Sequence, residues 1–518
     1  MKKTIALLLS LILCIGIFAG CENGGDKQAY KAPEGFSVGY SKADITPDLS
    51  LELGLVGTNN EKERIATGVV EPLYASCVAI TDEEGNTVIL FGTDLLHTAT
   101  YVTMAVRERI TEETGIEGKF VQFTASHNHS GPGQVAGYGF ANTDKYNEFF
   151  IDQCVKAATE ALLDRKPATM STTFTRTENL NYKRYYVLKD GTYVGRTGGY
   201  TQDDLYAHTE KADNLLQLVK FTREGGRDVA LINWQAHYKG GPTTQLNYSS
   251  DYFGVMRRLL LEQAGCESVF LLGASGDLAC NSEISTERDP NNTDYVSQGT
   301  ALANIAMKAM ENMTPAQTGK VCLEENIFHI DTNPNDYYLY TFGVGEIGFV
   351  MAPYEMYQSN GMDIRHDSPY KMTMIGTLAN ASDNNFYLPN ADAYDIPNAY
   401  GISEKYVKGD AEKFHEQYIN MLNACFEAGG QQKQEKAEGY VTDRTPKTDG
   451  VTYTNPNPGD KASMVAVNNG HYQVKLVKNS QLKTMLALNA EVAQKVIERS
   501  TMELLLDERD IITGVVEN

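Results

Sequence analysis

The sequence predicts an α/β fold in which mixed β-sheets are flanked by helices. Three stretches of the 518-residue chain indicate this. "CVAITDEEGNTVILFGTDLL" (77–96) has the pattern of two apolar strands around a Glu-Gly-Asn turn. "TYVTMAVRERITEETG" (100–115) follows as a helix that ends at its glycine. "NLLQLVKFTREGGRDVALINWQAH" (214–237) repeats the strand, glycine turn, strand pattern, so strands and helices alternate as they do in α/β domains.

The segments between these three fit the same fold. "KFVQFTASHNHSGPG" (119–133) is an apolar strand that runs into a glycine-proline loop. "NEFFIDQCVKAATEALLDRKP" (147–167) is an amphipathic helix ended by Pro167. The chain is long enough, and with 42% hydrophobic residues apolar enough, to bury a large core. We expect the functional residues on the loops at the strand ends.

The composition changes after residue 426. Residues 427–461 are polar and rich in Gly, Pro, Lys and Thr, which predicts a linker with at most one short strand. Residues 462–518 contain apolar strand patterns around a helix-like "NAEVAQKVIERS" (489–500) and predict a small C-terminal α+β domain.

The first twenty residues have the plan of an export signal. Lys2 and Lys3 precede an apolar run that is too short for a convincing spanning helix, and small residues end it. The junction "FAGC" resembles the lipobox of bacterial lipoproteins, which implies that Cys21 carries the lipid and that residues 21–35 form a polar tether. We therefore expect an exported protein, lipid-anchored at the extracytoplasmic face of the cell membrane. A plain signal peptide followed by an incidental cysteine is the alternative.

Charge and cysteine usage limit the partners. The formal net charge is -22, and removal of the signal makes the mature chain about -24, so nucleic acid is excluded as an expected ligand. The six cysteines after Cys21 are scattered and include no CxxC pair. Their spacing predicts neither a disulfide framework nor a thiolate zinc site.

The stretch "TASHNHSGPG" (124–133) is the first candidate for a functional site. If the strand is still extended there, His127 and His129 point to one side of it, because alternate residues of a strand share a face. Imidazole is a common zinc ligand, and a second histidine can orient the first or move a proton. Surface histidines without a metal are the alternative, since the H-x-H spacing alone is a weak signal.

His237 ends the apolar strand "VALINWQAH" (229–237) and precedes a second glycine-proline loop. A lone histidine there is more often a hydrogen-bonded structural residue, but two strand ends built alike favour a shared site. Catalytic zinc commonly takes a carboxylate among its protein ligands. Glu355 in "FVMAPYEMY" (349–357) is the best local candidate, since it follows a short apolar strand and a proline.

A series of motifs then resembles the neutral (non-lysosomal) ceramidase family. In chain order they are "VGYSKADITP", "TASHNHSGPG", "NYKRYYVLKDG", "NWQAHYKGG", "NYSSDYFG", "LLGASGDLACN", "APYEMY" and "LANASDNNFYLPNADAY". Each is modest evidence, whereas the ordered set is strong. The resemblance predicts a catalytic domain over residues 36–426 with the ceramidase fold.

The resemblance implies a zinc amidohydrolase that cuts the N-acyl bond of ceramide. It implies the metal ligands His127, His237, Glu355 and Tyr387, with Tyr394 as the alternative tyrosine. Zinc would activate a water for attack on the amide carbonyl. His129 and Arg184 would be the catalytic residues, the first moving a proton to the leaving amine and the second stabilising the oxyanion.

One motif departs from the family pattern. Ceramidases place a serine in an Ala-Gly-Asn-Leu-Ser-Pro-Asn type segment, where this chain has Ala279 at the serine and Cys280 at the proline, with Ser275 and Ser282 out of register. Cys280 as a nucleophile is the less favoured alternative. The last part also differs, because secreted ceramidases carry an immunoglobulin-like domain there.

Three interpretations therefore stay open. The first is a surface-anchored zinc amidohydrolase whose partners are a lipid or N-acyl amide substrate and, through Cys21, the membrane surface. The second is a hydrolase of another acylated or ester-linked compound on the same scaffold. The third is an inactive lipid- or solute-binding lipoprotein. The acyl-chain preference, the role of the C-terminal domain and the oligomeric state do not follow from the sequence.

Overall fold

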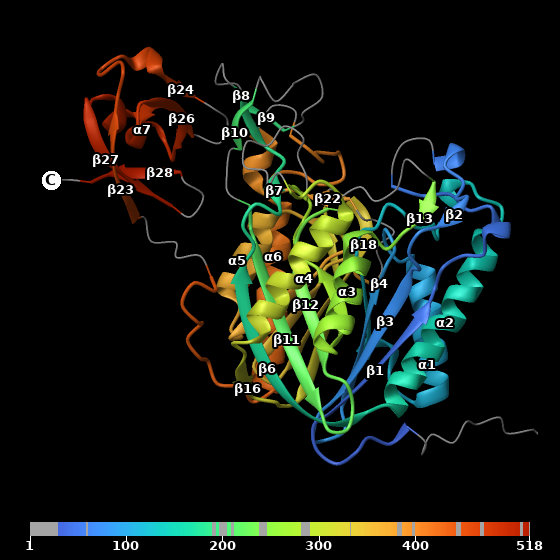
Figure 1. Cartoon of the computed structure of the whole chain (residues 1–518). Helices are drawn as coiled ribbons and strands as arrows, with labels where there is room; N and C mark the ends of the chain where they lie inside the picture. Colours follow the sequence, from blue (N-terminus) through green and yellow to red (C-terminus); the bar gives the residue numbers. More distant parts are fainter. Residues whose placement is uncertain are drawn as a thin grey trace, which may run out of the picture.

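The body of the protein has four layers, with helices outside and two β-sheets face to face inside (Figure 1). The computed structural model describes residues 30–57, 61–188, 193–195, 205–208, 212–237, 246–280, 291–331, 333–380, 386–395, 399–441, 447–466, 471–507 and 511–516. The predicted signal and most of the predicted tether lie outside these ranges.

The larger sheet has nine strands and mixes parallel with antiparallel pairs. Its order is β14-β12-β11-β6-β1-β3-β4-β5, and β16 pairs with β6 outside this path. The strands are β1 (Ser37–Asp44), β3 (Tyr74–Thr81), β4 (Thr87–Thr93), β5 (Val121–Ala125), β6 (Lys166–Arg176), β11 (Leu215–Arg223), β12 (Val229–Trp234), β14 (Glu267–Leu272) and β16 (Thr314–Ala316). The pairs β4–β5 and β12–β14 are parallel, so their carboxyl ends point toward the loops that carry the predicted histidines.

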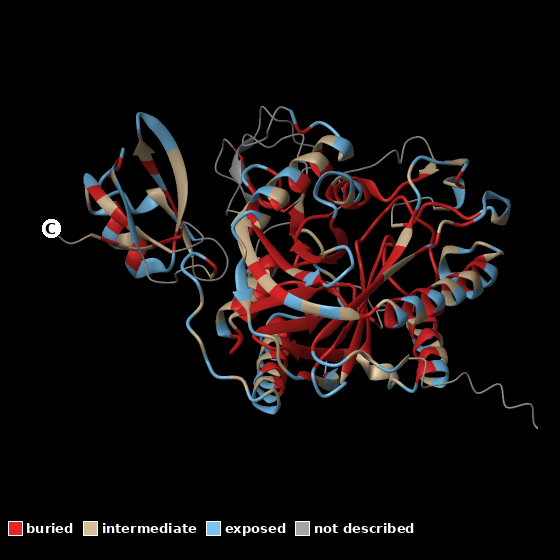
Figure 2. Cartoon of the chain, turned by 60° about the horizontal axis from the view of Figure 1, so that its bottom comes forward, coloured by how far each residue is buried: buried red, intermediate tan, exposed pale blue. Residues whose placement is uncertain are grey.

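The two faces of this sheet have different partners. Along β3, Cys77 and Ala79 pack against helices, whereas Val78 and Ile80 pack against the second sheet. This alternation follows from the two-residue repeat of a strand. The helices on the first face are α1 (Thr100–Thr114), α2 (Thr143–Leu163), α3 (Asp251–Ala264) and α4 (Tyr295–Met310). Both faces are covered, and Figure 2 shows the buried residues gathered along the central strands.

The smaller sheet closes the other side of the core. It has the order β17-β18-β19-β21, with β17 (Val321–Ile330), β18 (Asn333–Val344), β19 (Ile347–Met351) and β21 (Met372–Gly376). Its outer face is covered by α5 (Gln358–Asp367) and α6 (Asp410–Ala428). Short 3-10 turns connect the elements: Leu49–Leu51, Glu61–Glu63, Gly118–Phe120, Ala136–Tyr138, Ala391–Asp395 and Lys461–Ser463.

Short strand pairs fix the loops beyond the sheet ends. They are β2 (Gly68–Val69) with β13 (Asn247–Tyr248), β7 (Tyr182–Lys183) with β15 (Leu278–Ala279), and β20 (Glu355–Met356) with β22 (Tyr387–Leu388). A three-stranded sheet of β8 (Tyr186–Leu188), β9 (Tyr193–Val194) and β10 (Leu205–His208) lies at the same end of the body (Figure 1). Glu355 and Tyr387 lie in the β20–β22 pair, and Arg184 directly follows β7.

The C-terminal part forms its own sheet around a helix. Its six strands are β23 (Lys447–Thr454), β24 (Met464–Ala466), β25 (Tyr472–Lys478), β26 (Gln481–Ala487), β27 (Thr501–Leu506) and β28 (Ile512–Val515), and they pack with α7 (Ala490–Ile497). β23 belongs to this sheet although it falls in the stretch 427–461 that the composition predicts as a linker.

The predicted fold class is confirmed. β3, β4, α1, β5, β11 and β12 lie where the sequence patterns predict them, and Gly115 ends α1 with a φ of 80°. α2 overlaps the helix predicted over 147–167 but ends at Leu163, so Pro167 does not end it and lies in β6 instead. No helix in the described part of the chain is long and apolar enough to cross a membrane.

Candidate metal centre

Three buried side chains from distant parts of the sequence converge at one point. His127, His237 and Glu355 each offer one ligand atom, and these atoms lie within 4.8 Å of one another. His127 Nε2 is 3.3 Å and His237 Nε2 is 3.0 Å from Glu355 Oε2. Two imidazoles and one carboxylate at this spacing are a donor set that suits zinc and related metals.

His127 reaches the site through a turn of the backbone. β5 ends at Ala125, and His127 has a φ of 60°, in the left-handed region. The strand is therefore not extended there, and the two histidines do not share a strand face. They still lie together, since the rings of His127 and His129 meet edge to face with centroids 4.7 Å apart. His127 Nδ1 faces the carbonyl oxygen of Leu96 at 3.3 Å, so Nε2 is the nitrogen presented to Glu355.

His237 is oriented by two backbone carbonyls. Its Nδ1 lies 2.9 Å from the carbonyl oxygens of both Ser275 and Leu278, so it carries the proton that these oxygens accept. Nε2 is then left as a lone-pair donor. A metal-binding histidine commonly makes such a second hydrogen bond, which fixes its tautomer. Burial, together with the nearby Arg184 guanidinium, lowers the pKa of His237 to about 4, so the ring is neutral at physiological pH.

Glu355 stays ionised in this buried position. Burial alone would raise its pKa, but the neighbouring His127 and His237 outweigh burial and hold the pKa well below the usual range. Glu355 begins β20, whose backbone pairs with β22. The strand pair thus holds the carboxylate at its base, and Glu355 Oε2 faces the Nε2 atoms of both imidazoles.

The structure brings Tyr387, and not Tyr394, to this group. Tyr387 Oη is 3.2 Å from His237 Nε2, and the two rings are stacked with centroids 6.0 Å apart. Tyr394 lies in the 3-10 turn Ala391–Asp395, and its buried hydroxyl makes no hydrogen bond within the described residues. Burial, together with the Glu355 charge, raises the pKa of Tyr387 well above its usual value.

His129 lies next to His127. Its ring is buried against Gly57, where a Cβ atom would come within 2.5 Å of His129 Nδ1, so only glycine fits. Burial and the neighbouring His127 and His237 hold the pKa of His129 well below its usual value. A neutral imidazole in this position can accept a proton.

Arg184 places a cation beside the three ligand atoms. Its backbone N–H donates to the Asp277 carbonyl at 2.8 Å, and its guanidinium lies over the Tyr400 ring, 4.3 Å from the centroid. Burial lowers the pKa of Arg184, but Tyr400, Tyr387 and Glu355 raise it more, so the net shift is upward. The buried Nη1 makes no hydrogen bond within the described residues. The guanidinium is therefore available to a ligand.

Tyr400 is the main contributor that the sequence interpretation missed. Its hydroxyl is 3.2 Å from Tyr387 Oη, and its ring supports Arg184. No motif spacing in the sequence indicates that Tyr400 belongs to the site. The available signal is the next residue, Gly401, which has a φ of 77° and no room for a Cβ because the Tyr387 ring lies against it.

The segment that departs from the ceramidase pattern contacts the site through its backbone. Ser275 and Leu278 contribute the carbonyls that orient His237. Ala279 pairs with Tyr182 in the β7–β15 ladder. The Cys280 thiol is buried and donates to the His237 carbonyl at 2.9 Å, so it is directed at the backbone. Ser282 lies outside the described residues.

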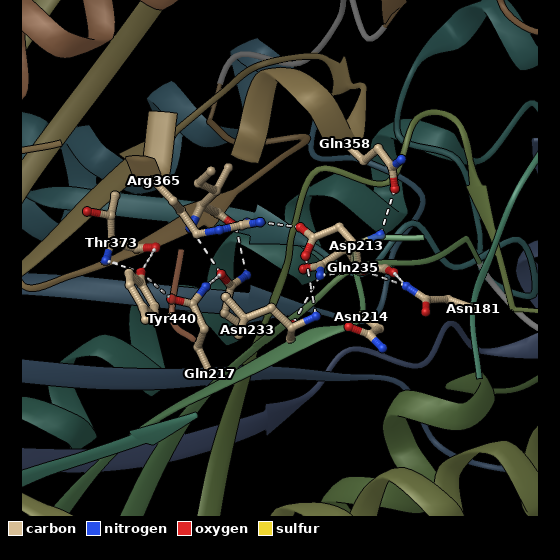
Figure 3. Close-up of polar contacts among 12 residues, drawn as sticks. Asn181, Asp213, Asn214, Gln217, Asn233, Gln235, Gln358, Arg365, Thr373 and Tyr440 are labelled. Carbon is tan, nitrogen blue, oxygen red and sulfur yellow. Dashed lines mark hydrogen bonds and ion pairs between the residues drawn. The ribbon is translucent and has the colours of Figure 1, made fainter. Parts of the chain in front are cut away.

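A buried polar network surrounds the chain at the end of β12 (Figure 3). Gln235 Nε2 and Asn181 Nδ2 both donate to the Asp213 carbonyl, at 2.7 and 2.8 Å. Gln358 Oε1 accepts from the Asp213 N–H at 2.7 Å, and the Gln358 N–H donates to the Asp277 carboxylate at 2.8 Å. Asp277 also pairs with Lys183 at 3.1 Å. These bonds tie the end of β12 to residues 275–278, whose backbone carbonyls orient His237.

The donor atoms have the chemistry and the orientation that a metal site needs. His237 presents Nε2 with its tautomer fixed, His127 presents Nε2, and Glu355 faces both as an anion. Tyr387 adds an oxygen at hydrogen-bonding distance from His237 Nε2. The residues present therefore fit a catalytic metal with nitrogen and oxygen ligands.

The chain is similar to known proteins both in sequence and in fold. Residues 36–336 match the family model described as neutral/alkaline non-lysosomal ceramidase, N-terminal. A solved structure titled "Ceramidase complexed with C2" is similar with a TM-score of 0.61 at 14% identity, covering 85% of each chain.

A second similar structure is the neutral ceramidase from Pseudomonas aeruginosa. It has a TM-score of 0.60 at 15% identity and covers 86% of this chain and 84% of its own. No curated protein sequence matches at a significant level. The structural likeness concerns the fold, and the family match spans more than half of the sequence, so the chain belongs to the neutral/alkaline non-lysosomal ceramidase family.

Proposed function

We propose that this protein is a zinc-dependent amidohydrolase that cleaves the N-acyl amide bond of ceramide or of a related N-acylated lipid. Family membership supports a hydrolase that acts on amide bonds. The observation that carries the proposal is the convergence of His127, His237 and Glu355 within 4.8 Å, with Tyr387 beside them. Similar structures include a neutral ceramidase.

The ligand residues would hold zinc through His127 Nε2, His237 Nε2, the Glu355 carboxylate and the Tyr387 oxygen. When bound, zinc would supply Lewis acidity, polarising the amide carbonyl and making water a stronger nucleophile at neutral pH. Ser275 and Leu278 would keep His237 in the required tautomer through Nδ1.

The remaining side chains would handle charge and protons. His129 lies against His127, and its lowered pKa keeps the buried ring neutral. A neutral imidazole has the lone pair with which it would take a proton and pass it to the leaving amine. Arg184 keeps its charge, and its Nη1 makes no hydrogen bond to the described residues, so it can stabilise negative charge on the former carbonyl oxygen. Its position over Tyr400 limits its motion.

We also propose that the protein is exported and held at the extracytoplasmic face of the membrane by a lipid on Cys21. The lipobox-like "FAGC" and the polar residues after it support this. Growth with a labelled fatty acid should label the wild-type chain, and Cys21→Ser should remove both the label and the membrane association. Labelling that persists in Cys21→Ser would contradict the anchor.

The test of the catalytic proposal is zinc content and hydrolysis by residues 22–518. Wild-type protein should bind about one zinc per chain and release fatty acid from ceramide or from an N-acyl amide in a matched panel. His127→Ala should lose both properties. A matched control is His471→Ala, because that histidine is partly exposed and lies in the C-terminal part, away from the three ligand residues. Wild-type protein without zinc would overturn the proposal.

Ala279 favours one alternative, a hydrolase of another acylated or ester-linked substrate on the same scaffold. It occupies the position where the family pattern has serine. If Ala279→Ser increases ceramide turnover while leaving turnover of a different panel compound unchanged, the natural substrate is that other compound. Stoichiometric zinc with no turnover on any compound would instead favour a binding lipoprotein.

A further inference from the structure

Asn128 lies between the two site histidines and is fully buried. Its relative exposure is 0%, and it belongs to none of the roles assigned above. A buried amide is costly unless its polar atoms are hydrogen-bonded. The contacts of Asn128 therefore indicate what it does.

All three polar positions of the Asn128 amide are used. Nδ2 donates to the Asp94 carbonyl at 3.0 Å and to the Ser249 carbonyl at 2.7 Å. Oδ1 accepts from the Ser130 N–H at 2.9 Å. One side chain thus joins the histidine loop to two loops from other parts of the sequence.

Both of those loops are themselves held firmly. The Asp94 carboxylate accepts two hydrogen bonds from Arg257 of α3, at 2.9 and 2.6 Å, and also the Tyr74 N–H at 2.8 Å. Ser249 lies just before α3, and its own N–H donates to the Ser130 carbonyl at 3.1 Å. Asn128 is therefore connected to fixed points on both sides of the turn.

The turn needs such support because His127 has a φ of 60°. A residue with a Cβ adopts this left-handed conformation at a cost, and it persists when the surrounding structure holds it. The Asn128 N–H donates to the Leu95 carbonyl at 3.0 Å, which anchors the backbone directly after His127. The side-chain bonds of Asn128 then fix the direction in which the chain leaves the turn.

We propose that Asn128 is a positioning residue that holds His127 and His129 in their site geometry through its three amide hydrogen bonds. This rests on the proposed function, since the geometry in question is that of a metal ligand and its proton-accepting neighbour. Only an amide of this length donates two hydrogen bonds and accepts one. An aspartate would point a carboxylate at the carbonyls of Asp94 and Ser249.

The decisive comparison is Asn128→Asp against Asn455→Asp, in residues 22–518. Asn455 is a matched control because its amide is also buried, donating to the Ile497 carbonyl and accepting from the Asn457 N–H, both at 2.9 Å, far along the chain in the C-terminal part. Zinc affinity is measured by competition with a chelator, and folding by circular dichroism. Asn128→Asp should weaken zinc binding by about tenfold or more and lower kcat with little change in KM. Asn455→Asp should change neither.

Asn128→Ser is the second variant. Its hydroxyl can still accept from the Ser130 N–H but can donate only once, so its zinc affinity should fall between wild type and Asn128→Asp. Wild-type zinc affinity and kcat in both folded Asn128 variants would overturn the proposal and leave the proposed function intact. Failure of both variants to fold would also overturn it, because Asn128 would then serve folding itself. Absence of zinc from the wild type would overturn both proposals.

Discussion

Glu355 and Tyr387 are register partners in the parallel pairing of β20 with β22. Partnered positions in adjacent strands lie side by side, so this two-residue ladder delivers the carboxylate and the phenol to the same place. The phenol then reaches His237 Nε2 at 3.2 Å, and the carboxylate reaches it at 3.0 Å. The local backbone pairing thus decides which tyrosine joins the site.

Tyr387→Phe should weaken metal binding, because it removes the oxygen next to His237 Nε2. We expect a loss of about tenfold or more in zinc affinity, measured by chelator competition. Tyr394→Phe is the matched control and should bind zinc like the wild type, since its hydroxyl makes no hydrogen bond within the described residues. The reverse result would assign the ligand role to Tyr394.

Arg184→Met should lower turnover without loss of metal. The methionine keeps apolar contact with the Tyr400 ring but removes the charge that interacts with Glu355 and His237. We expect kcat to fall about 100-fold or more, as when a group that stabilises an oxyanion is removed. Arg258→Gln, at an exposed position on α3, should have no effect. Normal kcat in Arg184→Met would exclude the charge-stabilising role.

Tyr440→Phe should destabilise the body although the residue precedes the C-terminal sheet. The Tyr440 hydroxyl donates to Gln217 Oε1 at 2.7 Å and accepts from the Thr373 N–H at 2.7 Å, inside the network of Figure 3. Without it, two buried polar groups lose a partner, which costs about 1–3 kcal/mol each. Urea unfolding should show a lower midpoint. Tyr453→Phe, in the C-terminal sheet, should leave the unfolding of the body unchanged.

Asp164 should make stability depend on pH in the acid range. Burial alone would raise its pKa, but hydrogen bonds from Lys166 and Arg223 outweigh burial and lower the pKa in the folded state. The unfolded chain then binds a proton more readily. The contribution of Asp164 is therefore present above its unfolded pKa and is lost as the pH falls through the folded one.

Asp164→Asn should accordingly be less stable than the wild type at pH 7, and the difference should shrink below about pH 4. Urea unfolding at a series of pH values measures this. A difference that stays constant from neutral to acid pH would show that Asp164 stabilises the fold without its charge.

Much of the site could be predicted from residue types and motif order. His127 and His237 each end a strand-like apolar run before a glycine-proline loop, and Glu355 follows a short apolar run and a proline. The structure brings the three together. The relative placement of His127 and His129 does not follow from the sequence in the same way, because strand alternation predicts a common face only while the strand is extended. The chain turns at His127 with a φ of 60°, and the rings meet through that turn.

Tyr400 shows why the rest of the site could not be predicted. It contributes through its contacts with Arg184 and Tyr387, and these depend on how two loops from different layers meet. A tyrosine in a loop carries no periodic signal, since neither helix nor strand repeats apply there. The same holds for Asn128, because the carbonyls of Asp94 and Ser249 that accept its hydrogen bonds are far from it in the sequence.

Hydrophobic periodicity and motif order are local properties of the chain, so they are enough to predict the α/β fold class, the alternation of strands and helices, and the residue types that carry the chemistry. Three relationships become visible in the folded chain alone: Tyr387 joins His237 and Glu355, Arg184 lies over Tyr400, and Tyr440 completes a network in the body. Those relationships depend on strand register and on packing between layers, and both are set by contacts between residues that are far apart in the sequence.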